Sequence, residues 1–204
     1  MGMVKTRAPR PKPTVGNILA AAAELFVARN YADVTVDQIA EAANVTKGAV
    51  YHHFSSKQDV YVAMLVDDLA YKSDLFDQAV AASDSCAGRL RALTGAFLAL
   101  SRTEQQIIRL VRRDANTFDT ATRAALVDAY QAALPNHVEA IIRKGIADGE
   151  LIPADPRLLA WQYIALFEVM LTSYADNRFG SDADKLNYVI SLFLRGCQRQ
   201  GERA

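Results

Sequence analysis

Apolar side chains recur every three or four residues along most of the chain, which is the period of an amphipathic helix. The first such stretch predicts a helix over 14–30, with an apolar face formed by Ile18, Leu19, Ala22, Leu25 and Phe26. No stretch keeps the two-residue alternation typical of a β-strand, and no repeat of 20–50 residues is present. The pattern therefore predicts an all-α fold of about nine helices.

Capping signals divide the next part of the chain into short helices. Thr35 and Gln38 have the spacing of a capping box, in which the hydroxyl accepts from a backbone N–H and the amide reaches back. Asn44 tolerates the left-handed backbone that a tight turn requires, and Thr46 caps a third helix over 46–53. Two short helices joined by such a turn form a helix-turn-helix unit.

Longer helices follow. A fourth helix starts after a cap at Ser56 and runs to about Ala82, and further helices are expected near 87–101, 104–115, 119–148, 155–178 and 182–200. Pro135 lies inside one of these segments and predicts a kink or a split there. Gly149 is expected to end one helix and Pro156 to open the next.

Charge differs between the two ends of the chain, although the net charge is zero. Residues 1–57 contain seven Lys and Arg against four Asp and Glu, and the remainder contains 16 against 19. A basic head on an acidic body suits contact with a polyanion. We expect a flexible basic arm over 1–13, a DNA-binding head over 14–60 and a ligand-binding and dimerisation domain over 61–204. The arm is either a tail without a partner or a segment that reaches DNA.

The segment after the first helix carries a specific residue pattern. Its positions are Thr35, Ile39, Ala40, Ala43, Val45, Thr46, Gly48, Tyr51, His53, Phe54 and Lys57. This pattern resembles the signature of the TetR family of transcriptional regulators. Asn44 and Thr46 stand where that family commonly has Gly and Ser, and both replacements keep the turn and the cap.

The resemblance implies that the third helix enters the major groove of operator DNA. Small side chains at its start allow close approach, and the helix N-terminus favours phosphate. The implied DNA-binding residues are Thr35, Thr46, Lys47, Gly48, Ala49, Tyr51, His52 and Lys57. Capping alone also accounts for Thr35 and Thr46, and His53 is expected to pack locally.

A single head reads only a few base pairs, so we expect a homodimer on a palindromic operator, as the resemblance also implies. The interface is predicted on the last two helices, at Leu159, Tyr163, Leu166, Met170, Val189 and Phe193; the alternative is that these residues are intramolecular core. A small hydrophobic or amphipathic effector is expected among the middle helices. Its candidate contacts, each also explained as plain core, are Met64, Phe97, Phe118, Tyr130, His137, Trp161 and Phe167.

Basic residues also gather along the segment from Arg102 to Arg113. Arg102, Arg109, Arg112 and Arg113 either receive an anionic group or form a solvated face paired with Glu104 and Asp114. We favour the solvated face.

No catalytic constellation, cofactor motif or metal-ligand spacing is present, so we expect neither an enzyme nor a cofactor or metal site. Cys86 and Cys197 form no CxxC pair, and no apolar run reaches the roughly 18 residues of a membrane span, so the protein is expected in the cytoplasm. The hypothesis is a ligand-responsive repressor, released when the effector tilts the helix over 57–82. The alternatives are an activator, a regulator without ligand sensing, and a helical enzyme or scaffold that reuses the fold.

Overall fold

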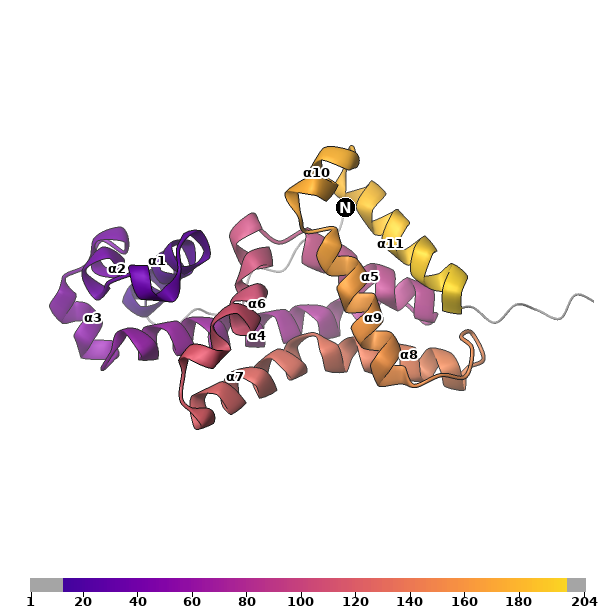
Figure 1. Ribbon diagram of the computed structural model, residues 1–204, viewed down its shortest axis with the longest axis horizontal. Helices are drawn as coiled ribbons and strands as arrows, with labels where there is room; N and C mark the ends of the chain where they lie inside the picture. The colour runs from indigo at the N-terminus through magenta and orange to yellow at the C-terminus, as the bar shows by residue number, and fades with distance from the viewer. Residues whose placement is uncertain (1–12, 198–204) are drawn as a thin grey trace, which may run out of the picture. The chain divides into compact units, whose positions relative to one another are not determined.

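The computed structural model describes residues 13–197, and every regular element in that range is helical (Figure 1). The all-α prediction is therefore confirmed. The elements are α1 (Pro13–Ala28), the short 3-10 helix η1 (Tyr31–Asp33), α2 (Val36–Ala42), α3 (Lys47–His53), α4 (Lys57–Val80), α5 (Cys86–Leu98), α6 (Arg102–Asp114), η2 (Ala115–Thr117), α7 (Thr120–Ala133), α8 (Pro135–Ala147), α9 (Pro156–Val169), α10 (Ser173–Arg178) and α11 (Asp182–Cys197).

The predicted capping residues occupy the expected positions. Thr35 Oγ1 accepts from the Gln38 backbone N–H at 3.3 Å, and the Gln38 side chain accepts from the Thr35 N–H at 2.9 Å. Asn44 has φ of 55° at the turn, and Ser56 Oγ accepts from the Asp59 N–H at 3.1 Å ahead of α4. Gly149, with φ of 76°, follows the end of α8. Local polar chemistry therefore sets most helix boundaries.

Two segments that were predicted as single helices are each divided. Pro135 splits 119–148 into α7 and α8, one of the two outcomes expected for it. The segment 155–178 is broken between α9 and α10, which corrects the prediction of one helix there. The break lies at Thr172, whose extended backbone leaves the helix while its Oγ1 accepts from the Ala175 N–H at 3.3 Å and starts a new one.

The chain forms two compact units. The first comprises 13–71 with 102–130, so α6 and most of α7 belong to the same unit as the helix-turn-helix, and the second comprises 72–101 with 131–197. The first unit is larger than the predicted head. The apolar faces of α1, α2, α3 and α6 form its interior, with fully buried side chains such as Ile18, Phe26 and Ile39.

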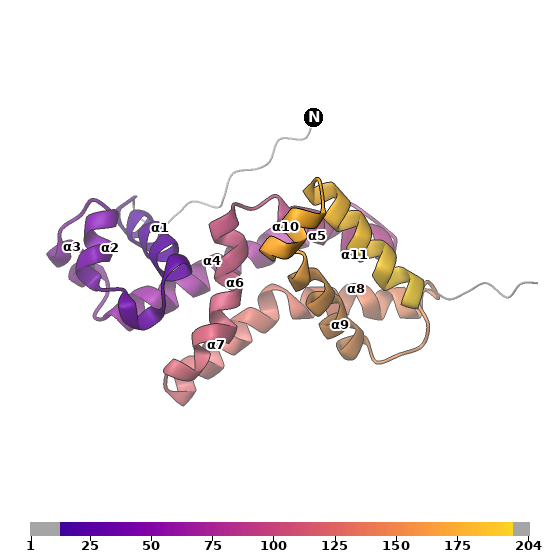
Figure 2. The ribbon, with the colours of Figure 1, turned by 45° about the horizontal axis from the view of Figure 1, so that its top comes forward.

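The second unit is a set of crossing helices. α8 packs against α9, and α5 packs against both α11 and α8 (Figures 1 and 2). Its interior includes Phe76, Phe97 and Tyr163, all at most 1% exposed. Nowhere between residues 13 and 197 does a helix combine the length and the apolar character needed to cross a membrane.

Candidate nucleic-acid interface

The third helix is held from one side by the rest of the helix-turn-helix. Thr46 Oγ1 accepts from the Ala49 N–H at 3.1 Å and closes the first turn of α3. Val50 is 1% exposed and packs into the apolar interior. Asn44 makes the turn from α2 possible because its short polar side chain accepts a positive φ. The anchoring face predicted for α3 is thus present.

The opposite face of α3 is open. Lys47, Gly48 and His52 are exposed, and Tyr51 keeps 48% of its surface exposed. A Cβ added to Gly48 would meet only Thr46 Oγ1, at 3.8 Å. The fold of the protomer therefore does not need a glycine at this position. The missing side chain leaves space for a partner that approaches α3 from outside.

Lys47 lies in an exposed ion pair. Its Nζ is 2.9 Å from Asp37 Oδ2 on α2, and this hydrogen bond raises the pKa of Lys47. The ammonium is therefore charged at neutral pH. Exposed ion pairs of this kind contribute little to stability, so a phosphate can replace Asp37 at small cost.

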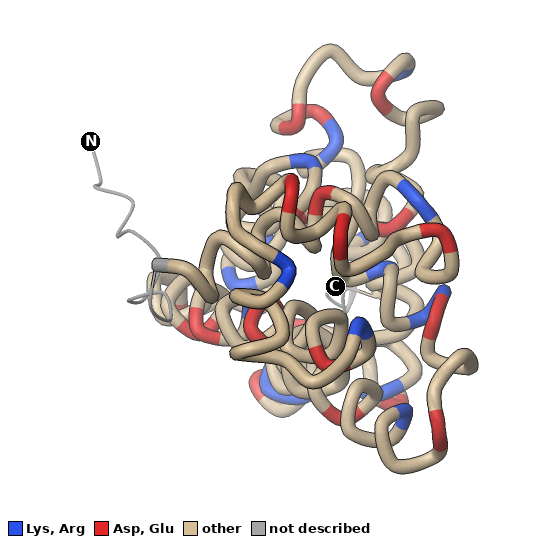
Figure 3. The backbone as a smooth tube through the Cα atoms, turned by 90° about the vertical axis from the view of Figure 1, so that its left-hand side faces the viewer, with Lys and Arg blue, Asp and Glu red and all other residues tan. Residues whose placement is uncertain are grey.

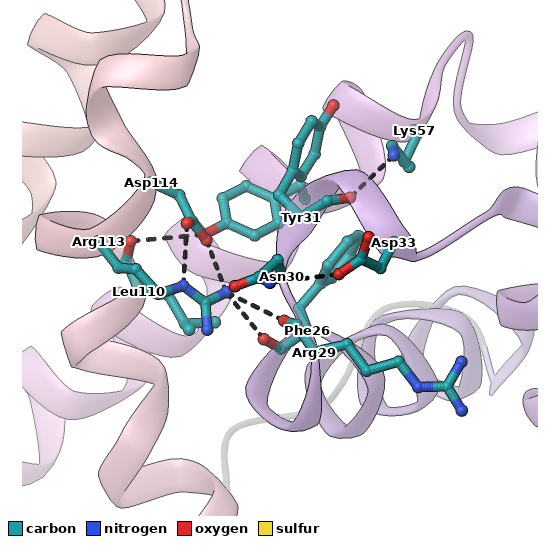
Figure 4. Close-up of polar contacts among 10 residues, drawn as sticks. Phe26, Arg29, Asn30, Tyr31, Asp33, Lys57, Leu110, Arg113 and Asp114 are labelled. Atoms are coloured by element: carbon teal, nitrogen blue, oxygen red, sulfur yellow. Dashed lines mark hydrogen bonds and ion pairs between the residues drawn. The ribbon is translucent and has the colours of Figure 1, made fainter.

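Lys57 is predicted to contact a phosphate, and in the protomer it contacts backbone carbonyls. Its Nζ donates to the carbonyl of Tyr31 at 2.8 Å (Figure 4). It also donates to the carbonyls of Val34 at 2.8 Å and Ala32 at 3.5 Å. The ammonium also lies 4.4 Å from the centre of the Tyr31 ring. An ammonium has three N–H groups, so these carbonyls occupy all of them. The ammonium is therefore an internal clasp on the segment between α1 and α2, and the phosphate contact stays a prediction that competes with these hydrogen bonds.

The remaining predicted DNA contacts are accessible or nearly so. Thr35 and Thr46 are exposed, and Ala49 is half-buried at the start of α3. His53 is exposed too, with its ring 4.9 Å from that of His52. The pattern thus brings an exposed polar strip to one face, but both threonines are also engaged as caps.

The folded part of the head is not basic. Residues 13–60 contain three basic and five acidic side chains, a net charge of −2, while residues 1–12 contain four Lys and Arg and no acid. Figure 3 shows basic and acidic positions interspersed along the chain. Positive charge at the N-terminal end therefore belongs mainly to the predicted arm, which lies outside the described residues apart from Pro13.

Three of the residues predicted to bind an effector come together in the second unit. The rings of Phe97 and Phe167 meet edge to face with centres 5.1 Å apart, and Phe76 links Phe97 to His137 at 6.2 and 6.1 Å. His137 Nε2 lies 3.0 Å from Asp77 Oδ1, and its buried Nδ1 has no hydrogen-bond partner. Sequence reasoning missed Phe76, because a single aromatic residue in a long helix looks like ordinary core.

The other predicted effector contacts are placed differently. Phe118 belongs to the first unit, where its ring lies 5.1 Å from that of Tyr31 and 5.3 Å from that of Tyr61. Met64 and Tyr130 are buried residues of the same unit. Trp161 is half-buried on α9, with the Arg157 guanidinium 5.5 Å from its ring centre.

The predicted dimer seam also needs correction. Leu159, Tyr163, Met170, Val189 and Phe193 are each at most 7% exposed within the second unit, and only Leu166 is half-buried. They are core of the protomer, as the alternative interpretation held. The large apolar side chains that remain exposed on α9, α10 and α11 are Leu158, Val169, Tyr174, Tyr188 and Leu192. Several of them line a groove of about 440 Å³.

Comparison with known proteins agrees with this geometry. A family model for bacterial regulatory proteins of the tetR family matches residues 18–64, which include α2, the turn and α3. An uncharacterised HTH-type transcriptional regulator, YhgD of Bacillus subtilis, is 23% identical over 87% of this chain and 92% of its own length. The HTH-type transcriptional repressor KstR2 of Mycolicibacterium smegmatis is 26% identical over 71% of this chain and 70% of its own.

A solved structure supports the same fold for nearly the whole chain. A bacterial regulatory protein of the tetR family from Rhodococcus RHA1 superposes with a TM-score of 0.79 at 19% identity, covering 93% of this chain and all of that one. The family match over residues 18–64, together with these relatives, supports a helix-turn-helix transcriptional regulator of the TetR type.

Proposed function

We propose that the protein is a ligand-responsive repressor that binds a palindromic operator as a homodimer and leaves it when a small hydrophobic or amphipathic effector binds. The observation that carries the proposal is the open face of α3, where Lys47, Gly48 and Tyr51 are exposed while Val50 anchors the helix. Basic and hydrogen-bonding side chains on a helix of this kind suit contact with phosphates and base edges in the major groove.

A second copy of the chain is supported by the exposed apolar residues of α9, α10 and α11. Val169, Tyr174, Tyr188 and Leu192 are each 45–70% exposed, and together they border one groove. Contiguous apolar surface of this kind marks an association site in a soluble protein. Two heads joined in this way can read two half-sites one helical turn apart.

An effector is supported by the ring cluster of Phe76, Phe97 and Phe167 with His137 beside it. Pockets for small molecules are mostly apolar, with a few polar groups that fix orientation. The buried, unpartnered Nδ1 of His137 is a polar group of this type. An effector that enters between these side chains should therefore be apolar and carry at least one hydrogen-bonding group.

The test begins with selection of duplexes from a random DNA pool, followed by anisotropy titration of the selected duplex. Lys47→Ala and Tyr51→Ala should each weaken binding, by about 5- to 150-fold for contacts worth about 1–3 kcal/mol. Lys144→Ala, which removes an exposed lysine from α8, is the control and should leave binding unchanged. Failure to enrich any sequence, or full affinity in both variants, would overturn the proposal and favour a scaffold or an enzyme on this fold.

Association and release are tested separately. Leu192→Glu should convert the sedimenting species to a monomer, because a carboxylate at a self-associating apolar surface is desolvated. Fatty acids, fatty alcohols and sterols are then added to the DNA complex. Release of DNA by one of these supports a repressor with an effector, and a promoter–reporter measurement distinguishes repression from activation.

A further inference from the structure

Helix α6 lies about 50 residues after the helix-turn-helix in sequence but packs against α1 in the same compact unit. Its inward residues Ile107, Leu110 and Val111 are at most 3% exposed. Polar contacts at its C-terminal end join it to two elements of the head, the end of α1 and the first turns of α4 (Figure 4).

Arg113 makes the contact with α1. Its Nη2 donates to the Phe26 carbonyl at 3.0 Å and to the Arg29 carbonyl at 3.2 Å, at the C-terminal end of that helix. The last carbonyls of a helix have no partner inside the helix, and the negative end of the helix dipole favours a cation there. Arg113 therefore caps α1 from another helix, 84 or more residues away in sequence.

Asp114 aligns this guanidinium and makes the contact with α4. Its Oδ1 and Oδ2 accept from Arg113 Nε at 2.9 Å and Nη2 at 2.7 Å, a two-point contact that fixes the plane of the guanidinium. The same Oδ2 accepts from the Tyr61 hydroxyl at 2.6 Å. The Asp114 side chain is only 10% exposed, so these partners are needed to hold its charge.

Aromatic packing surrounds the polar contacts. The Tyr61 ring meets that of Phe26 edge to face with centres 4.8 Å apart, and lies 5.1 Å from that of Tyr31. Tyr61 is fully buried, and burial followed by the bond to Asp114 raises the pKa of its hydroxyl, which therefore stays a donor at physiological pH. The polar contacts sit at the edge of a rigid apolar cluster.

We propose that Arg113, Asp114 and Tyr61 form a clamp that makes α6 a working part of the DNA-binding unit, with Arg113 as a positioning residue for the reading helix α3. The path is continuous, because α6 packs on α1, α1 on α2, and α2 on α3. The DNA-binding part of this inference rests on the proposed function, whereas the mechanical part does not.

The mechanical part is tested by hydrogen exchange on the full chain without DNA. Arg113→Gln should speed exchange in peptides 24–34 and 102–117 by about tenfold, because charge-assisted bonds are lost locally. Arg113→Lys should not restore protection, since an ammonium cannot reproduce the Nε and Nη2 contacts. Arg109→Gln removes the same charge one turn earlier on α6 and should leave both peptides unchanged.

The outcome for α1 decides this part of the proposal. Equal exchange in Arg113→Gln and wild type would overturn the clamp, and so would full rescue by lysine. If Arg113→Gln fails to fold, Tyr61→Phe is a less disruptive test of the clamp, because it removes only the hydroxyl that donates a hydrogen bond to Asp114. Its effect should appear in peptide 102–117 and be absent from the second unit.

The DNA part uses a duplex selected from a random pool. Arg113→Gln should lower the affinity about fivefold or more while the slope of log affinity against log salt stays the same, because Arg113 positions α3 and neutralises no phosphate. A reduced slope, or unchanged affinity, would refute the positioning role. If the wild-type chain binds no duplex, the proposed function fails, and the exchange result still stands for the clamp.

Discussion

Replacing Lys57 by Met tests whether this residue holds the head together or binds DNA. The change keeps an unbranched side chain and removes the ammonium. In the native protein this group bridges the carbonyls of Tyr31 and Val34 at 2.8 Å each, and lies over the Tyr31 ring. Both carbonyls belong to the segment between α1 and α2, so the loss should loosen the entry to the helix-turn-helix.

The size of the effect follows from these contacts. Two hydrogen bonds from a charged donor to carbonyls are worth about 1.5 kcal/mol each at the low end that suits a half-buried site. The contact with the Tyr31 ring adds about 0.5 kcal/mol. Water that hydrates the freed carbonyls in the variant recovers part of this free energy. The free energy of unfolding should therefore fall by about 2–3 kcal/mol.

Urea unfolding followed by circular dichroism measures this change. Lys144→Met is the matched control, because Lys144 forms only an exposed i,i+4 pair with Asp148, and its loss should cost less than about 0.5 kcal/mol. The salt dependence of DNA binding gives the second measurement. If Lys57→Met leaves stability unchanged but lowers the slope of log affinity against log salt by about 0.9 per head, Lys57 is a phosphate contact and the clasp is refuted.

Three further predictions concern other features of the chain. Asn44→Ala should lower stability by about 1–2 kcal/mol in thermal unfolding, because its φ is 55°, whereas Asn44→Gly should not, since glycine adopts that conformation freely. Burial raises the pKa of Cys86 to about 12, so its thiol is protonated at pH 8, and iodoacetamide should label it in urea but not in the native protein. Changing the four Lys and Arg of 1–12 to Gln should lower the salt slope of DNA binding by up to about 3.6 per head, and an unchanged slope would exclude the arm from DNA contact.

Polar contacts between residues close together in the sequence could be predicted from the sequence alone. The capping box at Thr35, the cap at Thr46 and the positive φ of Asn44 each involve a side chain and a backbone group within a few residues. Such contacts form in the same way in any helical protein. The pairing of Arg113 with Asp114 was expected as well, but on a solvated face, whereas the Asp114 side chain is only 10% exposed.

Contacts between distant segments could not be predicted in this way. Lys57 reaches carbonyls more than 20 residues earlier, and nothing in its neighbours distinguishes this role from phosphate binding. On α11, Tyr188 and Leu192 have the same four-residue spacing as Val189 and Phe193, yet the first pair is 45–49% exposed and the second at most 3%. Periodicity identifies a broad apolar stripe, but only the packed partner helices decide which edge of the stripe stays in contact with solvent.

The extent of the first unit has a similar physical cause. A three-helix head over 14–60 has fewer than 50 residues, and chains of that size bury too small a fraction of their surface to be firmly stable alone. α6 adds Ile107, Leu110 and Val111 to the same interior, and Arg113 satisfies carbonyls at the end of α1. Because the head depends on α6 for both apolar burial and capping, its stability depends on the position of that helix. The proposed clamp therefore links the stability of the head to the position of α3, so variants that weaken the clamp should change stability and DNA affinity together.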